Sequence, residues 1–477
     1  MATATATASY TTILPYKTSD RNSFAFTSAC KRWPVIITQA IDAVFRAIPG
    51  PKDEVKTKEG RKIVEELAKL KYEVQHNRAL TPLRDDGLPD ISHYNSALST
   101  LGEPTWLGIP WLFAECYLYR RMAISFNLTT SWKDYDVFLG SKLKTLRSSL
   151  PAILELAHRY TTITEPADFT DPASSLLFEE IFLICLWGNA TDLSLLTTLS
   201  HEDIQALQGS HARDESKKNI LANDIDKIYN LLTSLKQSKD GERQIDIVLD
   251  NSGFELFVDL YLAGYLLSQG LATRIVLHPK NHPWFVSDVL PSDFGILLNA
   301  LRDPIDFFLT QEGDEEEQDG RPELKQADLV SLKGLFDSLA GYHAEGKLSM
   351  RTSAYWTVQD PFWTLPSTEN SALWDDLKTS ELVIYKGDLN YRKLTGDSEW
   401  DPTTPFDISL GPVGKASGCR TLALRTCKAD VVVGLPEGTD ERLRREDPDN
   451  INEPEKRKWS WSGKYAVVQY CDGKLPE

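Results

Sequence analysis

The stretch Ile245–Glu255, reading IDIVLDNSGFE, constrains the fold more than any other part of the chain. Its apolar residues first alternate at every second position, as in a strand, and from Phe254 onward they recur at helical spacing. Between the two patterns lie Asp250 and Asn251, followed by the turn glycine Gly253. The sequence therefore predicts a strand that passes into a helix at an acid–amide pair.

The acid–amide pair has two interpretations. In open α/β sheets ligands bind at the carboxyl ends of strands, and adjacent Asp and Asn side chains offer the oxygen donors that a hard divalent cation prefers. Asp250 can equally serve as a cap for the following helix, which is a common use of Asp and Asn. From these residues alone, half of a metal site and a helix cap stay open.

Bulk composition excludes several classes of protein. The chain has 477 residues, which is enough for two or three domains with a sizeable core. Its net charge of −17 argues against non-specific nucleic-acid binding. Apolar runs stay short of the roughly 20 residues that span a bilayer. We expect neither a nucleic-acid partner nor a membrane partner.

Cysteine usage and the N-terminal sequence indicate the compartment. The six cysteines show no CxxC spacing, which is typical of reduced thiols and argues against structural zinc or a disulfide scaffold. The Thr/Ala-rich start lacks a basic segment followed by an apolar core, so no secretory signal is expected. We predict a cytoplasmic protein, with the nucleus as a second compatible location. Cys427 is considered as a nucleophile, but a buried thiol is the simpler interpretation.

The apolar spacing divides the chain into two parts. Residues 1–235 are predicted to form a mainly helical N-terminal region, and residues 240–477 an α/β domain that binds metal and substrate. The fold class is α/β: a helical N-terminal region packed on a C-terminal Rossmann-like, largely parallel α/β/α sandwich. The acidic run EGDEEEQD, near residues 312–320, is expected to be a flexible solvated insertion in that domain.

Local patterns predict individual elements. The helices expected are Trp33–Ile48, Lys58–Glu73, Pro110–Ile124, Leu143–Leu150, Leu176–Leu186, Ile220–Leu235, Phe254–Gln269, Pro291–Arg302 and Lys325–Ala340. The strands expected are Ile245–Leu249, Thr273–Leu277, Leu382–Tyr385, Thr421–Arg425, Val431–Gly434 and Tyr465–Tyr470.

A second polar segment follows the next strand. KNHPWFVSD, which ends at Asp288, comes after Thr273–Leu277, so Asp288 is expected to converge on Asp250 at one edge of the sheet. His278 and His282 have the spacing of a helical metal pair. The prolines that follow each of them break any helix between the two, which argues against zinc.

Two further segments carry charge beside strands. KGDLNYRKL, residues 386–394, is predicted to be a loop whose Asp388, Asn390 and Arg392 suit a polyol phosphate; a polar surface loop with an ion pair is the alternative. Lys428 in the sequence RTCK either reaches an anion or is exposed. Asn189 either reaches over the sheet or ends a helix.

Together these segments resemble the metal-dependent damage-control phosphatase family, in its subgroup with an RTxK signature that is also described as protein-glutamate O-methyltransferases. The matching segments are WLFAECYLYRRM, LWGNATDLSLL, LDNSGFELFVDL, HPKNHPWFVSDV, KGDLNYRKLTGD and RTCK, in this order along the chain. The resemblance covers nearly the whole chain from about residue 10.

The resemblance implies a site and a reaction. Metal ligands are implied at Asp250, Asn251 and Asp288, for manganese, cobalt, nickel or magnesium. Substrate-binding positions are implied at Asp250, Asn251, Asp388, Leu389, Asn390, Tyr391, Arg392 and Lys428. Asn189 and Glu255 are further candidate site residues, with no role assigned to them. The expected activity is hydrolysis of small sugar phosphates such as fructose 1-phosphate and fructose 6-phosphate.

In this mechanism the metal polarises the phosphoryl oxygens, and Asp250 is the first choice as general base. An aspartyl-phosphate route stays open, although the DxD pattern is absent at residues 250–252. One rival is methyl transfer from S-adenosylmethionine to a protein carboxyl; the strand-to-helix loop has only one glycine, Gly253, and cofactor approach favours several. The other rival is a non-catalytic interaction protein.

Overall fold

The structure is a computed structural model that describes residues 12–189, 217–238, 240–309, 323–450 and 453–474. Within these ranges the centre of the molecule is a seven-stranded sheet in the order β1-β7-β6-β5-β2-β3-β4. Neighbouring strands are parallel except for β6 and β7, which are antiparallel. The strands are β1 (Ile220–Asn223), β2 (Gln244–Val248), β3 (Arg274–His278), β4 (Leu348–Met350), β5 (Leu382–Lys386), β6 (Thr421–Thr426) and β7 (Ala466–Cys471).

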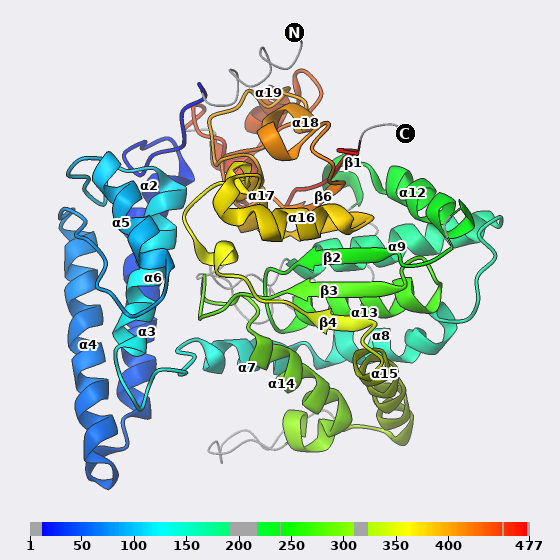
Figure 1. The fold of residues 1–477 in the computed structure, drawn as a ribbon, viewed down its shortest axis with the longest axis horizontal. Helices are drawn as coiled ribbons and strands as arrows, with labels where there is room; N and C mark the ends of the chain where they lie inside the picture. The colour runs from blue at the N-terminus through cyan, green and yellow to red at the C-terminus, as the bar shows by residue number, and fades with distance from the viewer. Residues whose placement is uncertain (1–11, 190–216, 239, 310–322, 451–452, 475–477) are drawn as a thin grey trace.

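Helices from the first part of the chain form a bundle that stands beside the sheet (Figure 1). The bundle and the connection to the sheet comprise α2 (Phe24–Thr27), α3 (Trp33–Ala47), α4 (Glu54–Gln75), α5 (Asp90–Thr100), α6 (Trp111–Asn127) and α7 (Leu139–Ser148). The apolar faces of α2 to α6 share one core, which also takes in Trp284, Phe285 and Val286 from the loop after β3. The bundle therefore holds a loop of the α/β part in place.

The remaining helices cover the two faces of the sheet. Side chains of Ile245 and Ile247 in β2 share a core with α8 (Leu150–Ile163), α9 (Pro172–Gly188), α12 (Ile225–Ser238), α13 (Phe254–Ser268), α14 (Pro291–Arg302) and α15 (Gln326–Ala344). Val248 points to the opposite face, into a core with α16 (Ser371–Thr379), α17 (Gly387–Leu394), α18 (Phe406–Ser409) and α19 (Thr439–Glu446). Alternate residues of one strand thus point into different layers, as the pleat requires.

The order of the strands places a topological switch point beside β2. From β2 the chain passes through α13 to β3 and then to β4 on one side, and it returns through α16 to β5 on the other side. Ligand sites in doubly wound sheets lie at the carboxyl ends of the strands where the order reverses in this way. The segments that follow β2, β3, β5 and β6 are the ones that the sequence marked as polar and functional.

The predicted fold class is confirmed: the protein is an α/β molecule with a largely parallel sheet and helices on both faces. Helices α8 and α9, from within the predicted N-terminal region, share the core of the sheet. The acidic run at residues 312–319 lies outside the described residues. Along the described ranges, no helix is long and apolar enough to cross a membrane.

Three local predictions are wrong. Residues 220–223 form β1 instead of the start of a helix, because they pair with β7 at the edge of the sheet. Val431–Gly434 is no strand, since its carbonyl groups accept from side chains: Arg425 Nη1 donates to Val431 O at 2.5 Å and Gln469 Nε2 to Val433 O at 2.7 Å. The segment 387–394 is the helix α17, not a loop.

Candidate active site

Backbone pairing brings Asp250 and Asp288 to the same edge of the sheet. Asn251 and Asp288 form an isolated antiparallel bridge. Val289 N donates to Asp250 O at 2.9 Å, and Ser252 N donates to Ser287 O at 2.7 Å. The loop after β3 therefore runs back alongside the end of β2, as the shared edge of the sheet predicts.

A buried cluster of two amides and two carboxylates lies at this edge. Asn189 Nδ2 donates to Asp250 Oδ2 at 2.6 Å and to Glu255 Oε2 at 2.8 Å. Asn251 Nδ2 donates to the same two oxygens, at 2.9 and 2.8 Å. Because both NH₂ groups point at carboxylates, both carbonyl ends point away from them. Asn251 Oδ1 accepts from Ser287 Oγ, and Asn189 Oδ1 accepts from Thr426 Oγ1, each at 2.5 Å.

The helix-cap interpretation of Asp250 is wrong. Helix α13 begins after Gly253, so its N-cap is this glycine and not Asp250. Asn189, the C-cap of α9, reaches over the sheet to Asp250, as one of its two interpretations predicted. Of the further candidates, Asn189 and Glu255 both lie in the cluster.

Gly387 allows α17 to approach Asp250 closely. Its φ is +80°, and a Cβ built on it would lie only 1.8 Å from Asp250 Oδ2. The first turn of α17 therefore lies against the acid–amide cluster. The side chain of its N-cap residue, Lys386, makes no capping hydrogen bond, and the amide groups of this first turn carry the partial positive charge of a helix N-terminus.

Lys428 and Asp388 come together beside the cluster. Lys428 Nζ donates to the carbonyl oxygen of Asn189 and, at 3.0 Å, to Asn189 Oδ1. Asp388 Oδ1 accepts from Lys428 N at 2.9 Å and from Arg425 Nε at 2.7 Å. The RTCK segment thus supplies a buried cation at the site, and its Arg425 orients Asp388.

Other residues of α17 contact protein groups in this structure. Arg392 binds Glu115 at 2.7 Å and Asp397 at 2.9 Å, and its guanidinium carbon lies 3.6 Å from the centre of the Trp111 ring. Asn390 Nδ2 donates to three backbone carbonyl groups, with the shortest distance, 2.7 Å, to Lys386 O.

The side chains of Leu389 and Tyr391 also pack within the protein. Leu389 lies in the core of the helical bundle. Tyr391 OH donates to Gln469 Oε1 at 2.8 Å. These side chains, together with Arg392 and Asn390, fix the position of α17.

Sequence reasoning missed Lys280, and it missed Lys386 and Asp259, two buried charges next to the candidate residue Glu255. Lys280 Nζ lies 3.4 Å from Asp288 Oδ2 and donates to Leu249 O at 2.9 Å. Lys386 Nζ lies 2.7 Å from Asp259 Oδ1 and 3.1 Å from Glu255 Oε1. Burial raises the pKa of Asp259 to about 6; Lys386 lowers it, and Glu255 raises it. The i,i+4 spacing of the two acids on α13 was the one signal available in the sequence.

The side chains of His278, His282 and Cys427 are buried and make contacts within the protein. His278 Nε2 bonds to Asp246 Oδ1 at 2.6 Å inside the sheet, whereas the His282 ring packs edge-on against Trp284. These surroundings agree with the argument against a zinc pair. Burial raises the pKa of Cys427 to about 11, which favours the thiol over the nucleophilic thiolate.

The cluster fits a divalent cation by the chemistry of its donors. Asp250, Asn251 and Asp288 offer hard oxygens and are each almost completely buried. Because the NH₂ group of Asn251 points at carboxylates, its carbonyl oxygen is the atom that can bind a cation. Within the described residues no three His, Cys, Asp or Glu side chains form a metal-binding group, so a site here depends on the asparagine.

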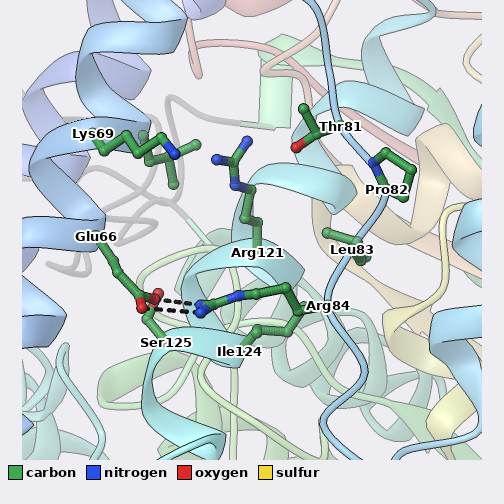
Figure 2. Close-up of a pocket in the computed structure, with 10 residues that line it drawn as sticks. Glu66, Lys69, Thr81, Pro82, Leu83, Arg84, Arg121, Ile124 and Ser125 are labelled. Carbon is green, nitrogen blue, oxygen red and sulfur yellow. Dashed lines mark hydrogen bonds and ion pairs between the residues drawn. The ribbon is translucent and has the colours of Figure 1, made fainter.

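A separate pocket of about 230 Å³ lies on the helical bundle (Figure 2). Lys69 and Arg121 point toward one another in it, but Arg84 is paired with Glu66. Arg121 is paired with Glu73 at 2.6 Å. None of the residues that line this pocket is a candidate site residue.

Fold and site define the class: an α/β protein with buried acid, amide and lysine side chains at the switch point of a largely parallel sheet. Comparison with known proteins identifies the family. Residues 28–443 match the damage-control phosphatase ARMT1-like domain. The chain belongs to this family of damage-control phosphatases, and it is therefore a phosphatase.

Relatives share almost the full length of the chain. Damage-control phosphatase ARMT1 of Xenopus laevis is 33% identical over 470 residues, which cover 94% of this chain and 97% of the relative. The proteins of the same name from Mus musculus and Homo sapiens are 33% and 31% identical, and each alignment covers 96% of this chain and 98% of the relative.

Among solved structures, a crystal structure of a DUF89 family protein from Pyrococcus horikoshii overlaps with a TM-score of 0.36 at 14% identity. The overlap covers 84% of this chain and 92% of that one.

Proposed function

We propose that the protein is a metal-dependent phosphomonoesterase that hydrolyses hexose phosphates, such as fructose 1-phosphate and fructose 6-phosphate, in metabolite damage control. The observation that carries the proposal is that Asp250 and Asn251, with Asp288 paired to them through the backbone, lie next to Lys428 and the first turn of α17. This arrangement combines hard oxygen donors for a cation with positive groups for a phosphate.

Each part of the cluster has a role in the proposal. Asp250, Asn251 and Asp288 would hold Mn²⁺, Co²⁺, Ni²⁺ or Mg²⁺, which when bound neutralises phosphate charge and polarises a phosphoryl oxygen. Lys428 and the amide groups at the N-terminus of α17 bind the phosphate, as helix N-termini do. Asp250, beside the cation, accepts the proton of the attacking water. Fixed charges of this kind supply most of what phosphoryl transfer requires.

The segment Asp388–Arg392 forms the substrate side of the site. Leu389 contributes its backbone N–H group, because its side chain packs in the core of the bundle. Asp388 and Asn390 face the sugar hydroxyl groups, and Tyr391 supports the helix from behind. Arg392, already held by Glu115 and Asp397, keeps α17 in position and adds positive charge.

Asp250→Asn and Asp250→Ala test the assignment. Both variants should lose at least about 10²-fold in metal-dependent phosphate release, the scale expected when a group that stabilises the transition state is removed. Asp246→Asn is the matched control, because Asp246 is a buried carboxylate within β2 that bonds to His278 and Ser380. Circular dichroism checks that each variant is folded. Full activity in Asp250→Asn would remove Asp250 from the mechanism.

A substrate and metal screen tests the specificity. Phosphorylated metabolites are assayed against manganese, cobalt, nickel and magnesium, and fructose phosphates should be turned over fastest. Titration with S-adenosylmethionine in a calorimeter is the control for the methyltransferase alternative. Tight binding of that cofactor, displaced by a sugar phosphate, would contradict the proposal.

A further inference from the structure

A tier of buried charges lies directly below the acid–amide cluster. Glu255 and Asp259 occupy successive turns of α13, and Lys386 ends β5. The Nζ atom of Lys386 lies between the two acids, 3.1 Å from Glu255 Oε1 and 2.7 Å from Asp259 Oδ1. It also donates to Cys185 O at 2.8 Å. All three charged side chains are 0% exposed, so their charges must compensate one another.

Glu255 connects this tier to the site. Its Oε1 lies against Lys386, and its Oε2 accepts from Nδ2 of both Asn189 and Asn251, at 2.8 Å in each case. An ionised carboxylate can only accept hydrogen bonds, so it binds the NH₂ end of an amide and never the carbonyl end. Glu255 is therefore one of three partners that fix the Asn251 amide with its oxygen, and not its NH₂ group, free for a cation; the others are Asp250 Oδ2, which accepts from the same Nδ2 at 2.9 Å, and Ser287 Oγ, which donates to Oδ1.

Lys386 holds Glu255 in place beside the amides. Two buried carboxylates on successive helical turns repel one another, and Lys386 Nζ lies between them and offsets this repulsion. The orientation of the Asn251 amide thus depends on a lysine that approaches from the neighbouring strand.

We propose that Glu255 and Lys386 are positioning residues that set the cation affinity of the site by fixing the orientation of the Asn251 amide. The inference rests on the proposed metal-dependent function. It assigns to neither residue a contact with the cation or the substrate.

Glu255→Gln is the first test, since glutamine has the same shape but can also donate a hydrogen bond. Binding of Mn²⁺ to the purified protein without substrate, followed by the electron paramagnetic resonance of free Mn²⁺, should weaken about 10- to 100-fold, as for partners of metal ligands. At saturating Mn²⁺, kcat and the KM for fructose 1-phosphate should stay within about threefold of wild type. Lys386→Met should weaken Mn²⁺ binding in the same way, and Lys386→Arg should restore part of it.

A double-mutant cycle separates orientation from general damage. In an Asn251→Asp background both ends of the side chain are oxygens, so there is no amide left to orient. Adding Glu255→Gln to that background should leave Mn²⁺ affinity unchanged or improve it, because a like charge is removed. Asp246→Asn is the control for loss of a buried charge: it should lower the Tm without changing Mn²⁺ affinity.

Three results would overturn the inference. If Glu255→Gln binds Mn²⁺ as wild type does while Asp250→Asn does not, the positioning role fails and the proposed function stands. An equal loss of affinity in both backgrounds would make Glu255 a direct ligand. A wild-type protein that binds no divalent cation would remove the proposed function together with the inference.

Discussion

Gly387→Ala gives the sharpest test of the geometry, because the change is a single methyl group pointing at Asp250. The Cβ would lie 1.8 Å from Oδ2, 2.3 Å from Cγ and 2.8 Å from Cβ of Asp250. Real Cβ atoms essentially never have a neighbour closer than 3.0 Å, and even Cβ of Asp250, which is bonded to the backbone, would lie closer than this. Rotation of the Asp250 side chain therefore cannot relieve the clash, and the end of β2 or α17 must move.

Two costs follow from this change. An alanine at φ +80° costs roughly 1–2 kcal/mol in backbone strain. Asp250 Oδ2 must also retreat by about 1.2 Å to reach a separation of 3.0 Å from the new methyl group. A misplacement of about 1 Å in a catalytic group costs about 10²-fold in rate. We expect at least that loss in kcat/KM, with weaker cation binding and a lower Tm.

Gly346→Ala separates strain from clash. Gly346 has φ +72°, and a Cβ there meets nothing within 4 Å. The control should lose the same roughly 1–2 kcal/mol of stability and keep its full metal-dependent phosphate release. Thermal unfolding and phosphate release are measured for both variants with and without Mn²⁺. If Gly387→Ala behaves like Gly346→Ala in both assays, α17 does not lie against Asp250, and the proposed geometry of the site is refuted.

Three more predictions concern pH and metal removal. Burial lowers the pKa of Lys393 to about 8, so between pH 8 and its ordinary value of 10.5 the unfolded chain binds more protons. Stability from this group should rise by about 3 kcal/mol across that window, and denaturant titrations should show the rise absent in Lys393→Met. Burial, with help from the nearby Arg120, lowers the pKa of His282 to about 4 from 6.5, so stability should be lost as the pH falls through that range. His282→Phe should lack this loss of about 3 kcal/mol, and an equal acid slope in both proteins would contradict the assignment. Chelation with EDTA should stop phosphate release and lower the Tm; at a cation concentration of about 100 Kd the lost stabilisation is about 2.7 kcal/mol, and an unchanged Tm in wild type would argue against a resident cation.

The sequence predicted the polar residues that follow β2 and β3, because the periodicity of apolar residues shows where each strand ends. A strand pattern that changes to a helix pattern located Asp250 and Asn251, and the rule that parallel strands share an edge brought Asp288 to them. The first inference needs only residues close together in the chain, and the second needs only that the consecutive strands β2 and β3 are parallel neighbours. The helix α17 was missed because Gly387 and a short polar run are typical of a turn, and only packing against β6 and the bundle makes them helical.

The charge tier was beyond local reasoning for a different reason. Lys386 and Glu255 lie on separate elements, and nothing in the spacing of either segment shows that they meet. The strand β1 was missed on similar grounds: its four residues, ILAN, are only partly buried, and pairing with the distant β7 makes them a strand. Contacts between distant segments depend on the topology of the whole sheet, which periodicity does not encode.

The helical bundle holds two parts of the site in position. Arg392 is held by Glu115 of α6 and lies over the ring of Trp111, so the bundle fixes α17. Trp284 and Phe285 insert into the same bundle core, so it also fixes the loop that carries Asp288. Phe285 has a positive φ of 43°, a strained conformation that the packing must hold.

Loosening the bundle should therefore weaken cation binding before it unfolds the sheet. Phe285→Gly relieves the strain but removes the aromatic anchor, and it should lower Mn²⁺ affinity while the far-ultraviolet circular dichroism stays that of wild type. Unchanged Mn²⁺ affinity in that variant would show that backbone pairing with Asn251 alone holds Asp288.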